Sequence, residues 1–467
     1  MNKKMMKAVN LLLWLCLWQI TAFFVDNRIY FASPYDTLTE LLVKAGDVVF
    51  WVSILSSLAR IVSGFLFAFL LAYILSFISY RYRWIGEFLS PMVSFLKSVP
   101  IAAVVVILLI WWGPDHLVLC ISMMVVFPNI YSSMLTGLFN TDSDLLEMSS
   151  VFEMKKVDKI LWIYRPSYLP QLHSAMGVSL GLCFKSGIAA EIIGLPEFSI
   201  GERLYRDKIY LNTPGVFAWI VAILALSSLT EVFFKYILKV IAKYPKQSLG
   251  MEEFLKSGSV KSSFSKKMPD GTGSIPEGYT VFSECVTKTY DGREIVNTSL
   301  KLKKGSTYYL DDPSGTGKTT LLKMISGCLA PDSGSVSTGR IAMVFQNDRL
   351  IESANVLRNL QVAGCVADPK EHLNDLIPDR IMMLPVSDIS GGERRRAAIA
   401  RALLHPSDIV ILDEPFAGLD ENTAGITAEW IKRHLGDRTL IFTSHGFFPD
   451  AFKNSERIKL IWIPEQH

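Results

Sequence analysis

The feature that most constrains this chain is the uneven distribution of its long apolar runs. About six stretches in the first 242 residues are long and apolar enough to cross a bilayer, which takes roughly 20 such residues in a helix. They lie near residues 10–25, 55–80, 92–112, 116–137, 174–195 and 215–238. From about residue 278 onward the composition is that of an ordinary water-soluble domain. The sequence therefore predicts a helical membrane domain at 1–242, a linker at 243–277 and a soluble domain at 278–467.

The distribution of lysine and arginine predicts the orientation in the membrane, because short cytoplasmic loops carry an excess of both. The loops of one set hold Lys3, Lys4, Lys7, Arg81, Arg83, Lys155, Lys156, Lys159, Arg165, Lys243 and Lys246. The opposite set holds only Arg28, Lys44, Arg203, Arg206 and Lys208. This bias places both termini, and the soluble half, in the cytoplasm. The first run follows a basic stretch as a signal peptide does, but "TAFFVDN" offers no small-residue cleavage site, which favours an uncleaved helix.

The net charge argues against one class of partner, and the cysteine spacing argues against two kinds of site. A net charge of +3 on 467 residues is too small to indicate nucleic acid binding. The six cysteines form no C-x-x-C pair and no metal-ligand spacing, so we assign neither a disulfide nor a zinc site. Residues 243–277 are rich in serine, glycine, lysine and proline, which is typical of a flexible linker.

The stretch "LDDPSGTGKTT" at 310–320 is almost a phosphate-binding loop, whose pattern is G-x-x-x-x-G-K-[ST]. It lies between a predicted strand and a predicted helix, the context such a loop needs. Backbone N–H groups would face the phosphates of ATP, Lys318 would reach the β- and γ-phosphates, and Thr319 would hold Mg²⁺. Asp312 stands where the first glycine is usual. The predicted nucleotide contacts of this loop are Ser314, Gly315, Thr316, Gly317, Lys318, Thr319 and Thr320.

A second motif, "IVILDEP" at 409–415, is a short apolar strand that ends in two carboxylates. Such a strand is typical of a buried parallel sheet, where ligands gather at the carboxyl end. We expect Asp413 to hold Mg²⁺ and Glu414 to polarise the attacking water.

Between these motifs the chain resembles a known family. Ile389–Glu393, "ISGGE", resembles the L-S-G-G-[QE] signature of ATP-binding-cassette (ABC) ATPases, with isoleucine in place of leucine. The resemblance covers about 280–463 and extends to the remaining family motifs. Gln346 matches the Q-loop, Ala417–Asp420 the D-loop, His445 the switch histidine and Tyr290 the aromatic residue that stacks on adenine.

The resemblance implies roles for these residues. Glu414, His445, Lys318 and Gln346 would be catalytic, and Thr319, Gln346 and Asp413 would be the metal ligands. In this family Ser390, Gly391 and Gly392 serve the nucleotide on a partner ATPase domain, so one such domain per chain implies a dimer, of two copies of this chain or of this chain with another subunit. Asp311 and Asp312 bring negative charge close to bound phosphates, so we expect a working ATPase with reduced affinity for ATP. Aspartate also tolerates unusual backbone angles better than most side chains, which would let Asp312 replace the glycine.

The cytoplasmic segment 145–172 resembles the E-A-A-x-x-x-G…I-x-L-P loop of binding-protein-dependent importers. Glu147, Ile163 and Pro166 fit this pattern, Ser149 is a small residue where alanine is usual, and the departures are Met148, Glu153 and Arg165. In such importers the loop docks into the ATPase beside the Q-loop. The flanking helices, over about 50–240, resemble permeases of the nitrate, sulfonate, taurine and pyrimidine-precursor type.

We therefore expect an α-helical transmembrane bundle followed by an α/β P-loop ABC ATPase domain, in the inner (cytoplasmic) membrane. The expected function is ATP-driven import of a small solute by a dimer, with ATP and Mg²⁺ as cofactors and a separate extracytoplasmic solute-binding protein as partner. An ABC exporter and a nucleotide-binding membrane sensor are the alternatives. Lys185 and Glu191 fall within one predicted span, and they line the solute path or form a structural pair. An anion would suit Lys185, whereas a neutral heterocycle would suit the aromatic-rich helices.

Overall fold

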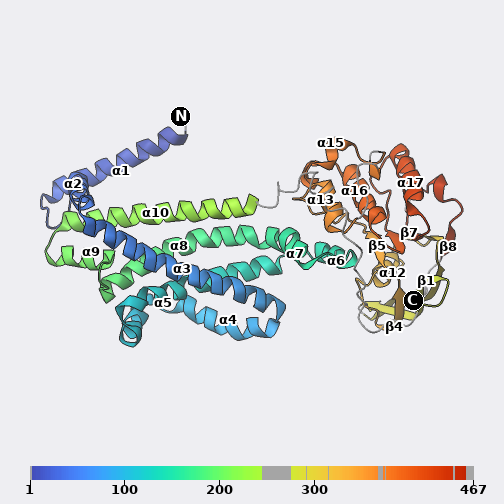
Figure 1. The fold of residues 1–467 in the computed structure, drawn as a ribbon, viewed down its shortest axis with the longest axis horizontal. Coiled ribbons are helices and arrows are strands. Elements are labelled where there is room, and N and C mark those ends of the chain that lie inside the picture. The colour runs from blue at the N-terminus through green and yellow to red at the C-terminus, as the bar shows by residue number, and fades with distance from the viewer. Residues whose placement is uncertain are drawn as a thin grey trace. The chain divides into compact units, whose positions relative to one another are not determined.

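The structure, a computed structural model, describes residues 3–243, 275–290, 292–313, 315–365, 372–373, 375–444 and 448–458. The chain forms two compact units (Figure 1). The helical unit contains residues 1–140 and 167–243, and the α/β unit contains residues 141–166 together with 244–467. Residues 141–166 thus pack with the α/β unit, although the chain enters and leaves them through long helices of the other unit.

The helical unit consists of long apolar helices joined by short turns. Several begin at residues that cap the first free N–H groups, as Ser33 and Asp47 do for α2 and α3. The helices are α1 (Lys3–Val25), α2 (Pro34–Ala45), α3 (Val48–Arg81), α4 (Arg83–Ser98), α5 (Ile101–Phe139), α8 (Arg165–Gly194), α9 (Ile200–Ile209) and α10 (Thr213–Lys243).

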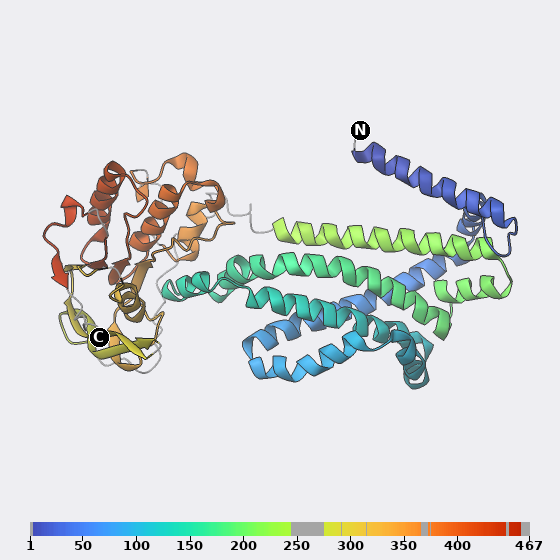
Figure 2. The ribbon, with the colours of Figure 1, turned by 180° about the vertical axis from the view of Figure 1, so that it is seen from behind.

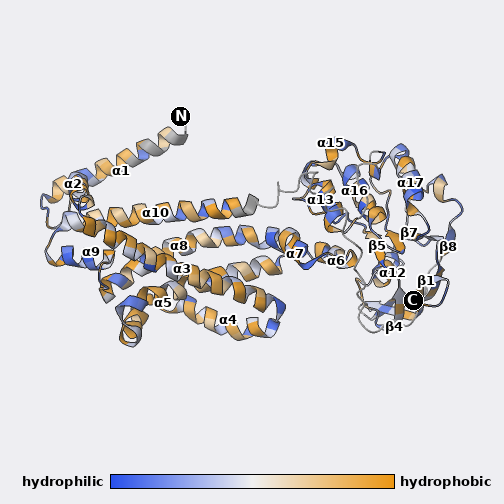
Figure 3. Cartoon of the chain, viewed as in Figure 1, coloured by the Kyte–Doolittle hydropathy of each residue, from blue (hydrophilic) through white to orange (hydrophobic). Residues whose placement is uncertain are grey.

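Four helical segments of the described residues are long and apolar enough to cross a membrane, fewer than the six runs expected from the sequence. They are Val48–Arg81, Ile101–Phe139, Lys156–Gly194 and Thr213–Val240, and α1 contains a shorter apolar stretch, Leu12–Val25. The difference has two causes: the apolar stretch of α1 is shorter than a span, and the runs at 92–112 and 116–137 do not form two separate helices. Gly113, with φ 73° and ψ 178°, bends the chain inside α5, so that two runs share one long element. Pro100 separates α4 from α5, which divides the run at 92–112. Figure 3 shows apolar residues along most of these helices.

Small residues let the long helices approach closely. A Cβ atom on Gly64 of α3 would lie 2.7 Å from Ser122 of α5, and one on Gly137 of α5 would lie 2.6 Å from Tyr168 of α8. Such close approaches are typical of helices that pack in lipid. The view from behind shows the same helices running alongside one another (Figure 2).

The α/β unit is built from two sheets and the helices that cover them. Its strands are β1 (Tyr279–Tyr290), β2 (Arg293–Lys303), β3 (Thr307–Leu310), β4 (Ser333–Thr338), β5 (Ile341–Val344), β6 (Ile409–Leu412), β7 (Thr439–Phe442) and β8 (Glu456–Ile458). Its helices are α6 (Ser143–Val151), α7 (Lys156–Lys159), η1 (Ile160–Tyr164), α12 (Lys318–Ile325), α13 (Val356–Val362), α15 (Asp379–Met382), η2 (Val386–Asp388), α16 (Gly391–Leu404), α17 (Glu421–Leu435) and η3 (Asp450–Phe452).

The larger sheet has the order β5-β6-β7-β3-β8, and each registered pair in it is parallel. Strands β5, β6 and β7 are buried along their whole length, which explains why "IAMV", "IVIL" and "TLIF" read as continuous apolar runs. The smaller sheet, β2-β1-β4, is antiparallel. Loops that follow β3, β6 and β7 therefore meet at one edge of the parallel sheet.

Candidate functional site

The phosphate loop predicted from the sequence connects β3 to the N-terminus of α12. Gly317 precedes the helix with φ 88°, and a Cβ atom there would lie 2.9 Å from Ile295 of β2. This position therefore requires glycine for both its backbone conformation and its space. Lys318 begins the helix, is buried, and donates a hydrogen bond to the carbonyl oxygen of Asp312. The loop thus folds back on itself around the lysine; Ser314 lies outside the described residues.

Asp312 does not occupy the backbone conformation that would favour glycine. The described non-glycine residues with positive φ do not include it. The expectation that aspartate replaces the glycine by tolerating unusual backbone angles is therefore wrong. The neighbouring Asp311 turns away to the sheet edge, where its carboxylate lies 3.2 Å from Arg457 and its N–H donates to Ile458.

A buried carboxylate lies opposite the phosphate loop. Asp413, which follows β6 and is 2% exposed, accepts hydrogen bonds from the hydroxyls of Thr319 (3.1 Å) and Thr443 (2.8 Å). A threonine hydroxyl and a carboxylate held together in this way are hard oxygen donors of the kind that Mg²⁺ prefers. The geometry thus fits the predicted metal ligands Thr319 and Asp413.

Glu414 has a strained backbone that its neighbours hold in place. Its φ is 52°, a region that non-glycine residues seldom adopt. Its N–H donates to the Thr443 hydroxyl at 2.9 Å, and its carbonyl accepts from Arg395 at 2.7 Å. Arg395 also binds the carbonyls of Phe345 and Asp413 and the carboxylate of Asp348, so one buried guanidinium joins α16 to the ends of β5 and β6. The sequence analysis missed both Arg395 and Thr443.

The signature segment forms a capped and exposed helix start. The Ser390 side chain and the Glu393 side chain each bond the other's backbone N–H, which is a capping box. The bonds from the backbone and hydroxyl of Ser390 hold the pKa of Glu393 below its usual value. A Cβ atom on Gly391 would meet nothing within 4 Å, whereas one on Gly392 would lie 3.3 Å from Leu419. Ser390 and Gly391 are exposed and thus accessible to another molecule.

The remaining predicted residues are distributed around this centre. Gln346 is exposed just after β5, next to the Phe345 carbonyl that Arg395 binds. Tyr290 lies at the end of β1 with 47% of its surface exposed, and no contact of the described residues joins it to Lys318 or Thr319. His445, the predicted switch histidine, lies outside the described residues. Gly315, Thr316 and Thr320 complete the loop and the first turn of α12.

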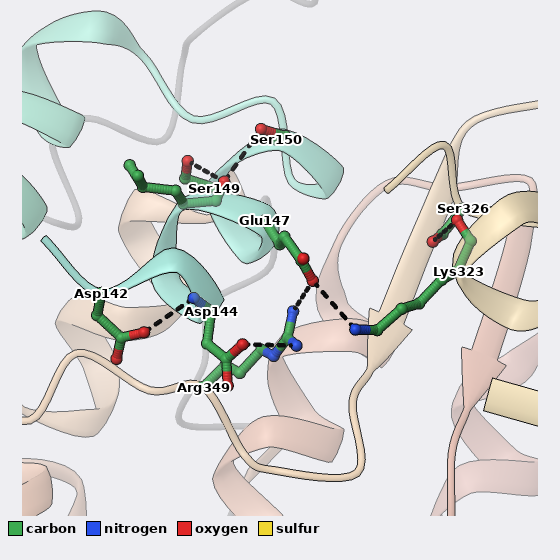
Figure 4. Close-up of polar contacts among 9 residues, drawn as sticks. Asp142, Asp144, Glu147, Ser149, Ser150, Lys323, Ser326 and Arg349 are labelled. Atoms are coloured by element: carbon green, nitrogen blue, oxygen red, sulfur yellow. Dashed lines mark hydrogen bonds and ion pairs between the residues drawn. The ribbon is translucent and has the colours of Figure 1, made fainter. Parts of the chain in front are cut away.

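The segment 141–166 docks against the α/β unit beside the Q-loop, as the resemblance implied. Arg349, three residues after Gln346, pairs with Asp144 at 2.9 Å and with Glu147 at 2.7 Å, both on α6 (Figure 4). Lys323 of α12 lies 3.7 Å from the same Glu147 carboxylate. The Arg349 side chain is 6% exposed, whereas the side chains of Asp144 and Glu147 are 40% and 32% exposed, so water reaches these ion pairs from the carboxylate side. The prediction that this segment contacts the ATPase near Gln346 is confirmed.

A second contact of this segment is aromatic. Phe152 is buried, with the Arg401 guanidinium 4.8 Å from the centre of its ring and His405 packed edge-on at 5.2 Å. Arg401 also donates to the carbonyls of Asp348 and Arg349. Burial lowers the pKa of Arg401 to about 10 and that of His405 to about 4, so His405 is neutral near pH 7. The C-terminal half of α16 therefore binds the Q-loop turn and the docked segment together.

Glu153, where the related loops have glycine, has φ 46° and ends α6 in a left-handed turn. We expect Glu153→Gly to stabilise the protein by about 1 kcal/mol, because glycine adopts this conformation without strain. Thermal unfolding of the purified protein measures the effect. Glu153→Ala, which removes the carboxylate but keeps the Cβ atom, is the matched control and should not raise Tm. An equal rise in both variants would show that charge, and not the backbone, is responsible.

Comparisons with known proteins agree with both units. Residues 295–417 match the family described as ABC transporter, and residues 41–243 match the binding-protein-dependent transport system inner membrane component. The aliphatic sulfonates import ATP-binding protein SsuB 1 of Rhodococcus jostii (strain RHA1) is 39% identical over 163 residues, 32% of this chain and 65% of that protein. SsuB 3 of the same organism is 34% identical over 36% of this chain and 72% of that protein.

The relatives differ in the solutes for which they are named. The spermidine/putrescine import ATP-binding protein PotA of Marinobacter nauticus is 29% identical over 38% of this chain and 53% of that protein. The chain spans about two thirds of the length of the SsuB proteins and about half of the length of PotA. All three are ATP-binding proteins for import, and their matches to this chain are supported by the ABC motifs described above. The chain therefore belongs to the ABC transporter family, as an importer-type membrane component and an ABC ATPase domain joined in one polypeptide.

Proposed function

We propose that this protein hydrolyses ATP to import a small solute across the cytoplasmic membrane, working as a pair of identical chains. The observation that carries the proposal is the contact of α6 with Arg349. Segment 141–166 connects the apolar helices α5 and α8, and its carboxylates bind an arginine three residues from Gln346. A change at the nucleotide can therefore reach the membrane helices through the ion pairs of α6.

The chain supplies the groups that phosphoryl transfer to water requires. Lys318 would neutralise the β- and γ-phosphates, and the half-buried Glu414 would orient the attacking water. Mg²⁺, bound by Thr319 and Asp413 with Gln346 nearby, would supply further positive charge to the phosphates. Arg395 and Thr443 act as positioning residues, because they fix the backbone of Glu414.

The signature segment supports a dimer. Ser390 and Gly391 are exposed at the N-terminus of α16, where N–H groups and the helix dipole favour an anion. We propose that they bind the γ-phosphate held by Lys318 of a second copy. Each nucleotide would then lie between two chains, with the phosphate loop from one and the signature segment from the other.

A mixing experiment tests both ATP hydrolysis and the pairing. Lys318→Ala removes the phosphate-binding lysine, and Gly391→Asp adds a negative charge where a Cβ atom meets open space, so the fold should be kept. We expect each variant alone to be inactive and a mixture of the two to recover ATP hydrolysis. Recovery occurs because a mixed pair combines an intact phosphate loop with an intact signature segment. A mixture as inactive as its parts would contradict a shared site between two copies.

We further propose that a separate extracytoplasmic binding protein delivers the solute. The importer-type permease match over residues 41–243 supports this part of the proposal. The SsuB relatives are named for aliphatic sulfonates and PotA for spermidine and putrescine, and these names belong to ATP-binding proteins. The similarity of the ATPase domain therefore supports import. The class of solute has to be inferred from the membrane helices.

Asp312 should weaken ATP binding through its charge. We expect Asp312→Asn to tighten ATP binding by about threefold to tenfold, since it removes a negative charge near the phosphates. Asp312→Gly should do no better, because the backbone here does not require glycine. Titration with a fluorescent ATP analogue measures the two Kd values. A gain with glycine that asparagine does not reproduce would show that backbone freedom limits binding.

A further inference from the structure

The helix α8 carries an exposed lysine in the middle of an apolar span. Lys185 lies nine residues before Gly194, the end of α8, which is about 14 Å along the helix. It is exposed on the surface of the helical unit. No ion pair or hydrogen bond joins it to another side chain of the described residues. A lone ammonium at this depth is costly in lipid, so such groups normally face a water-filled cavity.

The nearest carboxylate on the same helix is already engaged elsewhere. Glu191 is fully buried and accepts hydrogen bonds from the Ser57 hydroxyl at 2.7 Å and from the Gly201 N–H at 3.2 Å. Arg60 of α3 lies 3.8 Å from its other oxygen. Glu191 therefore joins α3, α8 and α9, and of the two alternatives left by the sequence, a structural pair of Lys185 and Glu191 is wrong.

Lys185 belongs to a row of exposed residues along α8. Exposed positions of α8 recur every three or four residues, at Ser174, Val178, Leu182, Lys185, Ala189 and Ile193. This row, the α8 face, includes a hydroxyl, an ammonium and the small Ala189. On α10 the exposed residues from Leu224 to Phe233 are apolar or small, and none of them is charged.

We propose that the α8 face lines the solute path, opposite the same face of a second copy, and that Lys185 selects a small anion. Two such faces would enclose water and bring two ammonium groups into one channel without a carboxylate of the α8 face to neutralise them. The channel would raise the local concentration of anions and repel cations. A sulfonate, carboxylate or phosphate group on the solute fits this site, and a polyamine does not. The proposal rests on the proposed function for the pairing of two copies and for the direction of movement.

Cysteine labelling of the full-length protein in lipid bilayers tests the path without ATP. Exposed Cys16 and Cys285 are first replaced by serine, and this parent protein gives the background. Ala189→Cys places a thiol one turn from Lys185. It is treated with sulfonatoethyl methanethiosulfonate, which is anionic, and with trimethylammonioethyl methanethiosulfonate, which is cationic. Leu229→Cys, on the lipid side of α10 and 69% exposed in the chain, is the matched control.

We expect Ala189→Cys to react with both reagents. When each rate is divided by that reagent's rate with a free thiol in solution, the value for the anionic reagent should be about tenfold higher than that for the cationic reagent. Adding Lys185→Gln should abolish this preference, and adding Lys185→Arg should keep it. Leu229→Cys should remain unreactive. If Ala189→Cys is as inert as Leu229→Cys, the α8 face lines no aqueous path. If the preference survives Lys185→Gln, Lys185 does not select anions.

The labelling results can be distinguished from a failure of the proposed import function. Labelling needs neither ATP nor a binding protein, whereas the mixing experiment on Lys318 and Gly391 reports hydrolysis and pairing. A protein with an anion-selective α8 face that fails in the mixing experiment would refute the pairing of two identical chains and leave anion selection by Lys185 standing.

Discussion

Replacing Glu414 by glutamine is expected to lower ATP hydrolysis at least about a hundredfold, because a neutral amide cannot accept a proton from the attacking water. ATP binding should persist, since Lys318 and the phosphate loop are untouched. The backbone contacts that hold Glu414, from Thr443 and Arg395, do not involve its side chain and should keep the fold. Phosphate release by the purified protein measures the rate, and nucleotide titration measures binding.

The matched control for this prediction is Glu421→Gln. Glu421 is an exposed carboxylate in the first turn of α17, seven residues after Glu414, and it lies outside the proposed site. This variant should hydrolyse ATP at the parent rate. If Glu414→Gln were as fast as Glu421→Gln, Glu414 would not be the group that orients water, and the sensor alternative would gain support.

Replacing Arg349 by alanine is expected to separate ATP hydrolysis from solute movement. The guanidinium is almost fully buried and bonds two carboxylates of α6, so its loss leaves Asp144 and Glu147 facing each other with Lys323 alone to balance them. Removing this buried arginine takes away the cation that holds both half-exposed carboxylates and so weakens the contact. We expect ATP-driven uptake to fall about tenfold or more, since each 1.4 kcal/mol lost from a contact weakens it tenfold.

Two further variants make the Arg349 prediction specific. Arg394→Ala removes an arginine of the same domain whose partner, Glu352, is largely exposed, and it should leave uptake unchanged. Arg349→Lys keeps the charge but loses the forked geometry that reaches both carboxylates, so its uptake should be intermediate. Uptake by Arg349→Ala equal to that of Arg394→Ala would contradict transmission through α6.

Short local patterns were enough to predict residues that the fold brings together at the candidate nucleotide site. The phosphate loop, the "LDEP" strand and the signature segment each lie within a dozen residues, and the parallel sheet brings Thr319 and Asp413 to 3.1 Å. The fold class could also be predicted from local patterns, since continuous apolar runs such as "IVIL" are typical of buried parallel strands, and it was confirmed. The docking of the loop 145–172 was implied by its resemblance to the importer loop, and its contact with Arg349, three residues after Gln346, was confirmed.

What the sequence did not predict depends on distant contacts. Arg395 and Arg349 look like ordinary surface arginines in "GGERRR" and "QNDRL", and only tertiary packing shows that both are buried. The two departures from family glycines look alike in sequence, yet Glu153 is in the left-handed region and Asp312 is not. The exposure of Lys185 likewise depends on how α8 packs, because helical spacing alone does not tell which face is covered.

The central claim is that nucleotide held by the α/β unit drives solute through the helical unit. Its most direct test is ATP-dependent uptake into liposomes that contain this protein and its binding protein, with Lys318→Ala as the variant. We predict that the variant takes up no more solute than liposomes without ATP. Uptake by Lys318→Ala equal to that of the unaltered protein would contradict the claim.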